Sequence, residues 1–234
     1  MKNKLTHFLN MSVLILLLVS FSYTNLTGQG RVKRDSLKSL IYAHDLKRKA
    51  TEKNEPSILD SSKVNDLYSL AKIYGGVDLD TSFIYGNQIL NLSKKIGYKK
   101  GEGFGYNILG VICMYKADHK LAIKHFQDGK LAFEAADFKS GLANILGNIG
   151  LTYQNQGNAE QAITYQLKAL NIRKAIGDKK GLAVSYSNIG HIYHFQGKYN
   201  EALSYLLNGV KIFDEIGDKR NAALTYEDIG MLYR

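Results

Sequence analysis

The sequence predicts an all-α fold, an α-α superhelical solenoid of stacked helix hairpins, and two observations carry the prediction. The first is a repeat, because residues 141–180 and 181–220 are identical at 17 of 40 positions in register. The second is the pattern within each copy, where bulky side chains recur at spacings of three and four and a glycine follows each periodic segment. A fixed period of this length is typical of solenoids, in which each unit contacts only its neighbours.

Each copy is predicted to contain two helices. In the copy that begins at residue 181, Asp178 is positioned to cap a first helix that runs to about Phe195, and Gly197 ends that helix. A second helix is predicted over about 199–216, and Gly217 supplies the left-handed residue that ends it. The next cap, Asp218, follows at once, so the pattern starts again.

Small residues recur where the two helices of one hairpin must approach each other. Gly150 and Gly190 lie on the first helices, and Ala162 and Ala202 lie on the second helices of the same copies. We predict that each glycine faces the alanine of its own copy, so that the two backbones pack closely.

The period divides the chain into three parts. Residues 1–30 form the first and residues 31–62 a short amphipathic helix that serves as a linker or cap. Residues 63–234 form the solenoid, with repeats at about 63–98, 101–138, 141–178 and 181–218 and a half repeat at 221–234. Because a half repeat leaves Ile229, Leu232 and Tyr233 without a covering helix, we expect the natural polypeptide to continue past residue 234.

Residues 1–30 have the pattern of an export signal. Lys2 and Lys4 precede a short apolar core at 11–21, and small and polar residues follow at 27–30. The core is too short to span a bilayer stably. We therefore expect an exported protein, with an uncleaved membrane anchor as the alternative.

Charge and cysteine content exclude several classes of protein. The net charge is +10, but the lysines are spread over helix ends, where solvation alone explains most of them. Direct nucleic-acid binding is not expected, because the tyrosines occupy the hairpin core instead of alternating with lysines on one face. Acidic peptides or a membrane surface suit the basic excess better. A single cysteine excludes a disulfide-stapled module.

The repeated positions resemble the tetratricopeptide repeat. They are Leu146, Ile149, Gly150, Tyr153, Gly157, Ala162 and Ala169, and in the next copy Tyr186, Ile189, Gly190, Tyr193, Gly197, Ala202 and Gly209. The usual repeat has about 34 residues, whereas this one has 40 and resembles a variant with longer helices. The resemblance covers about residues 63–234. It implies a concave groove that binds a protein or peptide segment, with no catalytic residue, cofactor or metal.

The resemblance also implies which side chains face the groove. They are Asn107, Asn144, Asn148, Gln154, Asn188, His191, His194 and Phe195. Amides suit a peptide backbone because each offers donors and acceptors. Asn148 and Asn188 are the strongest candidates, since they occupy the same position one repeat apart; the alternative is that such an Asn only bonds a neighbouring helix. His191 and His194 are predicted to line the groove, because no carboxylate or thiol is expected beside them to complete a metal site.

Catalytic motifs are missing from the sequence. It contains no Gly-x-Ser-x-Gly, no His-Glu-x-x-His and no paired cysteines. The glycines at 101, 103 and 105 lack the spacing and the preceding strand of a phosphate-binding loop, and we assign them to the junction between repeats. A non-catalytic role follows.

A wider resemblance gives an alternative function. A signal-like start, the stretch Lys63-Val64-Asn65-Asp66-Leu67 and several 40-residue repeats are similar to the exported N-terminal parts of bacterial membrane sensors. This implies the periplasm or cell envelope of a Gram-negative-type bacterium. The chain would then be the input domain of a longer histidine kinase, nucleotide cyclase or transcription regulator, tethered to the membrane through a C-terminal region beyond residue 234. The ligand and the oligomeric state are not predicted.

Overall fold

The structure, a computed structural model, describes residues 31–46 and 58–233, and the part that it describes contains helices and no strand. Residues 31–46 form one helix. The others are α2 (Ile58–Tyr74), α3 (Leu79–Lys95), α4 (Lys99–Tyr115), α5 (His119–Ala135), α6 (Lys139–Asn155), α7 (Ala159–Ala175), α8 (Lys179–Phe195), α9 (Tyr199–Glu215) and α10 (Lys219–Met231). The helices α3 to α9 have 17 residues each. Two such helices and their two three-residue turns account for the 40-residue period.

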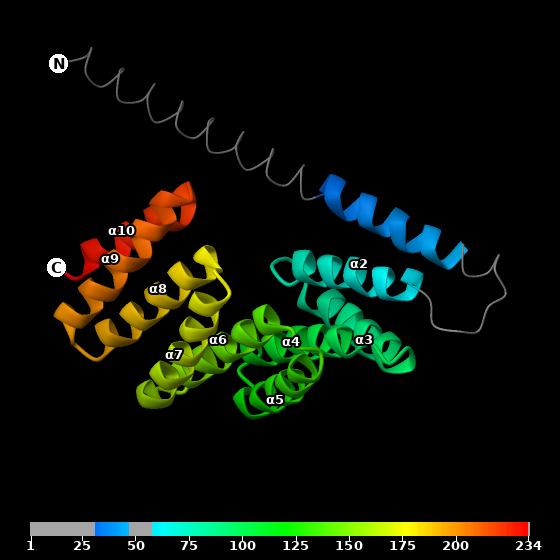
Figure 1. The fold of residues 1–234 in the computed structure, drawn as a ribbon, viewed down its shortest axis with the longest axis horizontal. Helices are drawn as coiled ribbons and strands as arrows, with labels where there is room; N and C mark the ends of the chain where they lie inside the picture. Colours follow the sequence, from blue (N-terminus) through cyan, green and yellow to red (C-terminus); the bar gives the residue numbers. More distant parts are fainter. Residues whose placement is uncertain (1–30, 47–57, 234) are drawn as a thin grey trace, which may run out of the picture.

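The hairpins follow one another along an arc (Figure 1). Helices that are consecutive in the chain pack against each other, and the first helices of successive hairpins, α2, α4, α6 and α8, also contact one another. The first helices therefore line the inside of the curve and the second helices lie outside it. This arrangement confirms the predicted α-α solenoid.

Polar side chains cap α3, α5, α7, α8 and α10, and a residue with positive φ follows each helix from α3 to α9. The carboxylates of Asp118, Asp178 and Asp218 accept hydrogen bonds from backbone amides in the first turns of α5, α8 and α10. Glycines at 97, 157, 177, 197 and 217 adopt φ values from +68° to +75° just after the helices end. The predicted cap and both predicted terminator glycines, Gly197 and Gly217, are confirmed.

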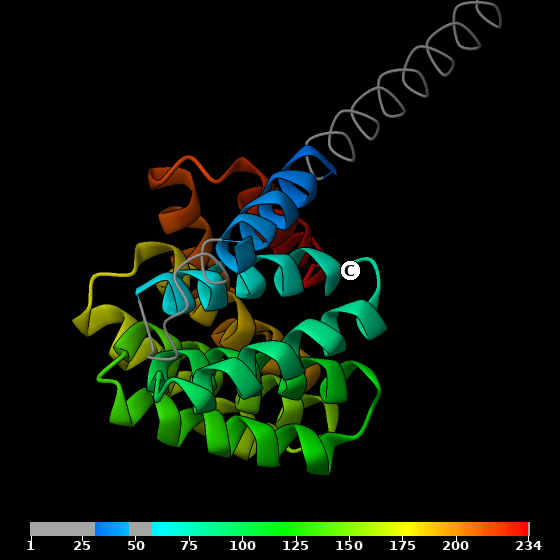
Figure 2. The ribbon, with the colours of Figure 1, turned by 90° about the vertical axis from the view of Figure 1, so that its right-hand side faces the viewer.

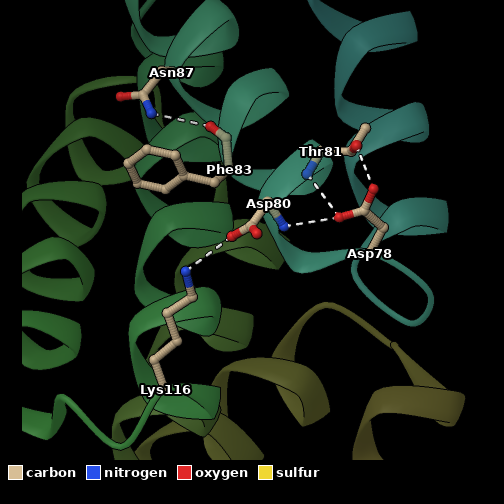
Figure 3. Close-up of polar contacts among 6 residues, drawn as sticks. All are labelled: Asp78, Asp80, Thr81, Phe83, Asn87 and Lys116. Atoms are coloured by element: carbon tan, nitrogen blue, oxygen red, sulfur yellow. Dashed lines mark hydrogen bonds and ion pairs between the residues drawn. The ribbon is translucent and has the colours of Figure 1, made fainter.

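Figure 3 shows the start of α3 in the first hairpin. The Asp78 carboxylate accepts from the amides of Asp80 (3.1 Å) and Thr81 (3.0 Å). The Lys116 amine, at the end of α4, bonds Asp80 at 3.1 Å and so links two repeats on their exposed side. Asn87 donates to the carbonyl of Phe83 in its own helix at 3.0 Å. This last contact is the purely local use of an asparagine.

The predicted close approach of the two helices in a hairpin is confirmed. A Cβ atom on Gly190 would lie 2.7 Å from Leu206 Cγ and 3.2 Å from the Ala202 carbonyl oxygen. A Cβ atom on Gly150 would lie 3.1 Å from the Ala162 carbonyl oxygen. Contacts this short leave no room for a larger side chain without movement of the backbone.

The glycines at 101, 103 and 105 were expected in the junction between repeats. They lie instead within the first two turns of α4. A Cβ atom on Gly103 would meet the Phe133 ring at 2.4 Å, and one on Gly105 would meet Leu90 at 2.9 Å. Gly103 and Gly105 are therefore required by the packing of α4 against α5 and α3.

The helix at 31–46 packs against α2, as Figure 2 shows. His44 Nε2 lies 3.1 Å from an Asp66 carboxylate oxygen, Asp45 pairs with Lys63, and Ile41 packs against the core. Since α2 begins at Ile58, the predicted boundary between residues 62 and 63 falls inside this helix. The predicted export signal at 1–30 lies outside the described residues. Among the helices described, none has the length and apolar content needed to cross a membrane.

Many of the buried apolar side chains belong to one of two clusters, and others, such as Leu170 on α7 and Ile189 on α8, are buried outside both. The larger runs from Val64 in α2 to Ile149 in α6, with Tyr165 of α7 packed against it. The smaller consists of Ala183, Val210, Phe213 and Ala222, contributed by α8, α9 and α10. The second helix of the third repeat, α7, lies between the two clusters.

Candidate peptide groove

The inner face of the arc is defined here by the exposed and half-exposed side chains of α4, α6, α8 and α10. All of the predicted groove residues lie on these helices: Asn107, Asn144, Asn148, Gln154, Asn188, His191, His194 and Phe195. Asn144 and Phe195 are exposed, and the other six are half-buried. The predicted residues are thus accessible, although they do not form one cluster.

Asn107 and Asn148 join neighbouring first helices. The Asn148 amide nitrogen donates to the Asn107 carbonyl oxygen at 2.9 Å, from α6 to α4. The prediction grouped Asn148 with Asn188, its equivalent one repeat later, whereas the structure pairs it with an asparagine 41 residues earlier. Asn148 therefore makes the bond to a neighbouring helix that was the alternative to ligand binding. The remaining donor and acceptor capacity of both amides stays available on the inner face.

Asn144 is held by a residue that the sequence analysis did not select. Arg173 reaches from α7 to the inner face, where its Nη2 donates to the Asn144 carbonyl oxygen at 3.0 Å. Its Nη1 donates to Ser185 Oγ at 2.7 Å and to the Gly181 carbonyl oxygen at 3.1 Å. Arg173 is 6% exposed. Burial lowers the pKa of its guanidinium, while the charge of Asp178 raises it.

The two predicted histidines point to different neighbours. His191 Nε2 lies 2.5 Å from a carboxylate oxygen of Asp228, which connects α8 with α10. The expectation that no carboxylate lies beside this pair was therefore wrong. His194 instead stacks with Phe195 and Tyr199, at centroid distances of 5.7 and 6.0 Å. Within the described ranges, no three His, Cys, Asp or Glu side chains converge in a way that could hold a metal ion.

Two hollows adjoin the predicted residues. A cavity of about 220 Å³ lies beside Asn107 and Asn144, with Tyr68 and Phe104 among its walls. These two rings are stacked, with their centroids 4.2 Å apart. Burial raises the pKa of the Tyr68 hydroxyl, and a hydrogen bond with Asn107 lowers it. A larger cavity, about 430 Å³, contains Gln154 and Phe195 in its lining, at the edge where first helices end.

A family model described as tetratricopeptide repeat matches residues 104–175 and, in a second overlapping placement, residues 141–215. The chain is a tetratricopeptide-repeat protein. The matched region covers α4 to α9, and the helix bounds show that the same hairpin pattern extends to α2 and α10.

The chain is also similar to individual proteins, in sequence to one and in structure to another. The uncharacterized protein ycf37 of Guillardia theta is 34% identical over 83 residues, which are 36% of this chain and 46% of that protein. The match therefore spans less than half of that relative. The crystal structure of BtubC from P. vanneervenii superposes with a TM-score of 0.70 at 13% identity, over 87% of this chain and 83% of that one.

A Rap protein solved in complex with competence and sporulation factor is also similar. Its TM-score is 0.66 at 21% identity, over 82% of this chain and 54% of that chain. At such identities the similarity shows a common fold.

Proposed function

We propose that this tetratricopeptide-repeat protein is a non-catalytic binding module, whose inner face takes an extended peptide segment of a partner protein. The observation that carries the proposal is the series of amide side chains on three consecutive first helices: Asn107 on α4, Asn144 and Asn148 on α6, and Asn188 on α8. Amides present donors and acceptors together, which is what the backbone of an extended peptide requires. The solved complex of a Rap protein with competence and sporulation factor supports the proposal, because that protein shares the fold.

The fixed orientation of two of these amides adds to the argument. Arg173 has only donors, so the atom of Asn144 that faces it is the carbonyl oxygen, and the Asn144 NH₂ group is left for the groove. Asn148 uses one N–H on Asn107 and keeps a second N–H. Side chains that are held before binding lose less conformational entropy when a peptide arrives.

Selection from a displayed random-peptide library, followed by affinity measurement on the enriched peptides, tests the proposal. In the double variant Asn148→Ala/Asn188→Ala we expect affinity to fall about tenfold or more, equivalent to about 1.4 kcal/mol. The matched control is Asn87→Ala/Asn208→Ala, because these two asparagines only bond carbonyls in their own helices.

Two results would contradict the proposal. One is that the wild-type chain enriches no peptide over an empty support. The other is that both double variants bind the enriched peptides equally well while circular dichroism shows unchanged helix content. The second result would indicate a scaffold role instead.

We further propose export, and with it the alternative of a sensor input domain in a longer protein. Both are supported by the sequence of residues 1–30 and by the stretch 63–67. Of that stretch, Val64 and Leu67 are buried in the core, so their apolar character also has a packing reason. An antibody raised against the solenoid tests the alternative on fractionated cells. A membrane-bound species much heavier than 26.2 kDa would favour the sensor, and a cytoplasmic species would exclude export.

A further inference from the structure

The third repeat is polar at interior positions where its neighbours are apolar. Forty residues before and after Arg173 lie Phe133 and Phe213, which are both buried. Gln166 likewise stands 40 residues after Phe126 and 40 residues before Leu206. We call the set Asn144, Gln166, Arg173 and Ser185 the polar seam. Its members lie on α6, α7 and α8 (Figure 1). Arg173 and Ser185 meet where the third repeat passes to the fourth, whereas Gln166 faces Gly147 and Gly150 of α6 inside the third hairpin.

One contact in particular changes its chemistry from repeat to repeat. In the second repeat, Phe104 and Phe133 pack edge to face at 5.6 Å. The residues 40 positions later are Asn144 and Arg173, which share a hydrogen bond of 3.0 Å. In the fourth repeat the corresponding Phe213 is again apolar and packs with Val184 in the smaller cluster. The apolar contact of the second and fourth repeats is therefore a polar one in the third. In the first repeat the same position holds Ser93, a small buried residue whose hydroxyl has no hydrogen-bond partner among the described residues.

The seam satisfies its buried polar groups only in part. Gln166 is fully buried and donates to the Gly147 carbonyl oxygen at 3.0 Å, but its own carbonyl oxygen has no hydrogen-bond partner among the described residues. Arg173 Nε is likewise buried without a partner in this part of the chain. Buried polar atoms that remain unpaired lower stability, and replacing such groups with apolar residues of similar size is often stabilising.

In a solenoid the total stability is a sum over repeats and the interfaces between neighbours, so the least stable interface is where the array separates first. We propose that the α7–α8 junction is a built-in joint, at which the solenoid moves as two units, residues 58–175 and residues 179–233.

The joint is connected to the inner face by Arg173. Its guanidinium bonds Asn144 on α6 and, from the other side, Ser185 and the Gly181 carbonyl oxygen on α8. A peptide that accepts a hydrogen bond from the Asn144 NH₂ group therefore acts on a side chain that Arg173 also holds, and so biases the position of α8. This coupling rests on the proposed function, whereas the joint itself does not.

Hydrogen exchange of the purified chain tests the joint without any ligand. We expect amides in the middle of α8 and α9 to exchange about tenfold faster, or more, than amides in the middle of α4 and α6, because they open as a separate unit. Equal protection in the two units would overturn the proposal.

A repacked variant identifies the cause. Gln166→Leu with Arg173→Phe introduces the residues that the fourth repeat carries at Leu206 and Phe213. We expect the difference in exchange between the two units to fall to about threefold or less. The control Arg173→Lys keeps a buried cation and should retain the wild-type difference. If α8 and α9 still exchange fast in the repacked variant, their position near the end of the described array is the reason, and the joint is wrong.

Two additions keep the test decisive. Should the double variant fail to fold, Arg173→Phe alone replaces it, since buried phenylalanines already occupy the equivalent place at Phe133 and Phe213. For the coupling, a peptide enriched under the proposed function is added during exchange. We expect it to change exchange in α8 of the wild-type chain about threefold and to leave α8 of Asn144→Ala unchanged. A peptide that binds without this difference would overturn the coupling and leave the proposed function standing.

Discussion

The α5–α6 junction and the α7–α8 junction are built on the same backbone plan with different side chains. At the first, Phe133 lies among Phe104, Phe138 and the glycine at 141, and Ile145 of the following helix is fully buried. At the second, Arg173 takes the place of Phe133 and Ser185 that of Ile145. The hairpins stack alike in both cases, so the repeat geometry does not depend on an apolar interface at every step.

The difference shows what holds each junction together. The α5–α6 junction relies on apolar burial, which has no preferred direction and tolerates small shifts. The α7–α8 junction relies on two hydrogen bonds from the Arg173 guanidinium, to Ser185 Oγ and to the Gly181 carbonyl oxygen, which are lost as soon as the helices separate. One junction should therefore be stable and the other should open readily.

The most destructive single change should be the loss of the aromatic ring at the apolar junction. We expect Phe133→Ala to lower the free energy of unfolding by about 3–5 kcal/mol, because the ring is fully buried and its removal leaves a cavity. Urea unfolding followed by circular dichroism measures the change. If Phe133→Ala lowers the free energy of unfolding by less than Arg173→Ala does, the α7–α8 junction contributes more to stability than the α5–α6 junction, which is the opposite of what we expect.

The next largest effect is expected within a hairpin. Leucine at Gly150 should destabilise the protein by about 1–3 kcal/mol through overpacking against the Ala162 carbonyl and Gln166. Gly230 occupies the same position two repeats later and has nothing within 4 Å of its Cβ site, so it is the matched control. We expect Gly230→Leu to be neutral or to stabilise by up to about 1 kcal/mol, as leucine favours a helix over glycine. Equal losses at both glycines would contradict the close approach at Gly150.

The sequence alone was sufficient for the fold because each hairpin is specified locally. Gly150 and Gly190 must accommodate a facing backbone, and Gly197 and Gly217 must adopt positive φ, and all four recur every 40 residues. The period itself predicts which residues share a position. The start of α2, where the pattern is degraded, was placed five residues too late, and the glycines at 101, 103 and 105 were placed in a junction instead of in α4.

The candidate site was less predictable because its contacts join different repeats. His191 meets Asp228, 37 residues away, and the offset depends on how much successive hairpins rotate. Arg173 was overlooked because a basic residue in the last turn of a helix is usually solvated. A signal did exist in the sequence: phenylalanine stands 40 residues before and after it, at Phe133 and Phe213.

A smaller change should come from the cap beside the polar seam. Asp178 caps α8 by accepting from the Gly181 amide at 2.9 Å, and its charge faces Arg173. We expect Asp178→Ala to lower the free energy of unfolding by about 1 kcal/mol. The Asp178→Asn variant should keep most of the stability that the cap contributes, because Asn also caps helices. If Asn is as harmful as Ala, the charge opposite Arg173 matters more than the cap.

The smallest effect concerns an ion pair that only the later repeats possess. Lys180 on α8 bonds the Asp218 carboxylate at 2.7 Å, whereas Ser140 stands at the position of Lys180 in the third repeat. The hydrogen bonds from Lys180 and Asn221 hold the pKa of Asp218 at about 2, below its usual 3.8. Because the folded pKa is the lower one, the contribution to stability is complete above about pH 4 and is lost as the pH falls through about 2.

We therefore expect the contact between α8 and α10 to weaken over that acidic range, and the Asp218→Asn variant to lack this part of the pH dependence. Nuclear magnetic resonance of the Asn221 amide, which donates to Asp218, follows the titration directly. Added salt should reduce the difference, since Lys180 is largely exposed. An Asn221 titration midpoint near 4 in the folded chain would show that the ion pair contributes nothing, and the α8–α10 contact would then depend on His191 and Asp228.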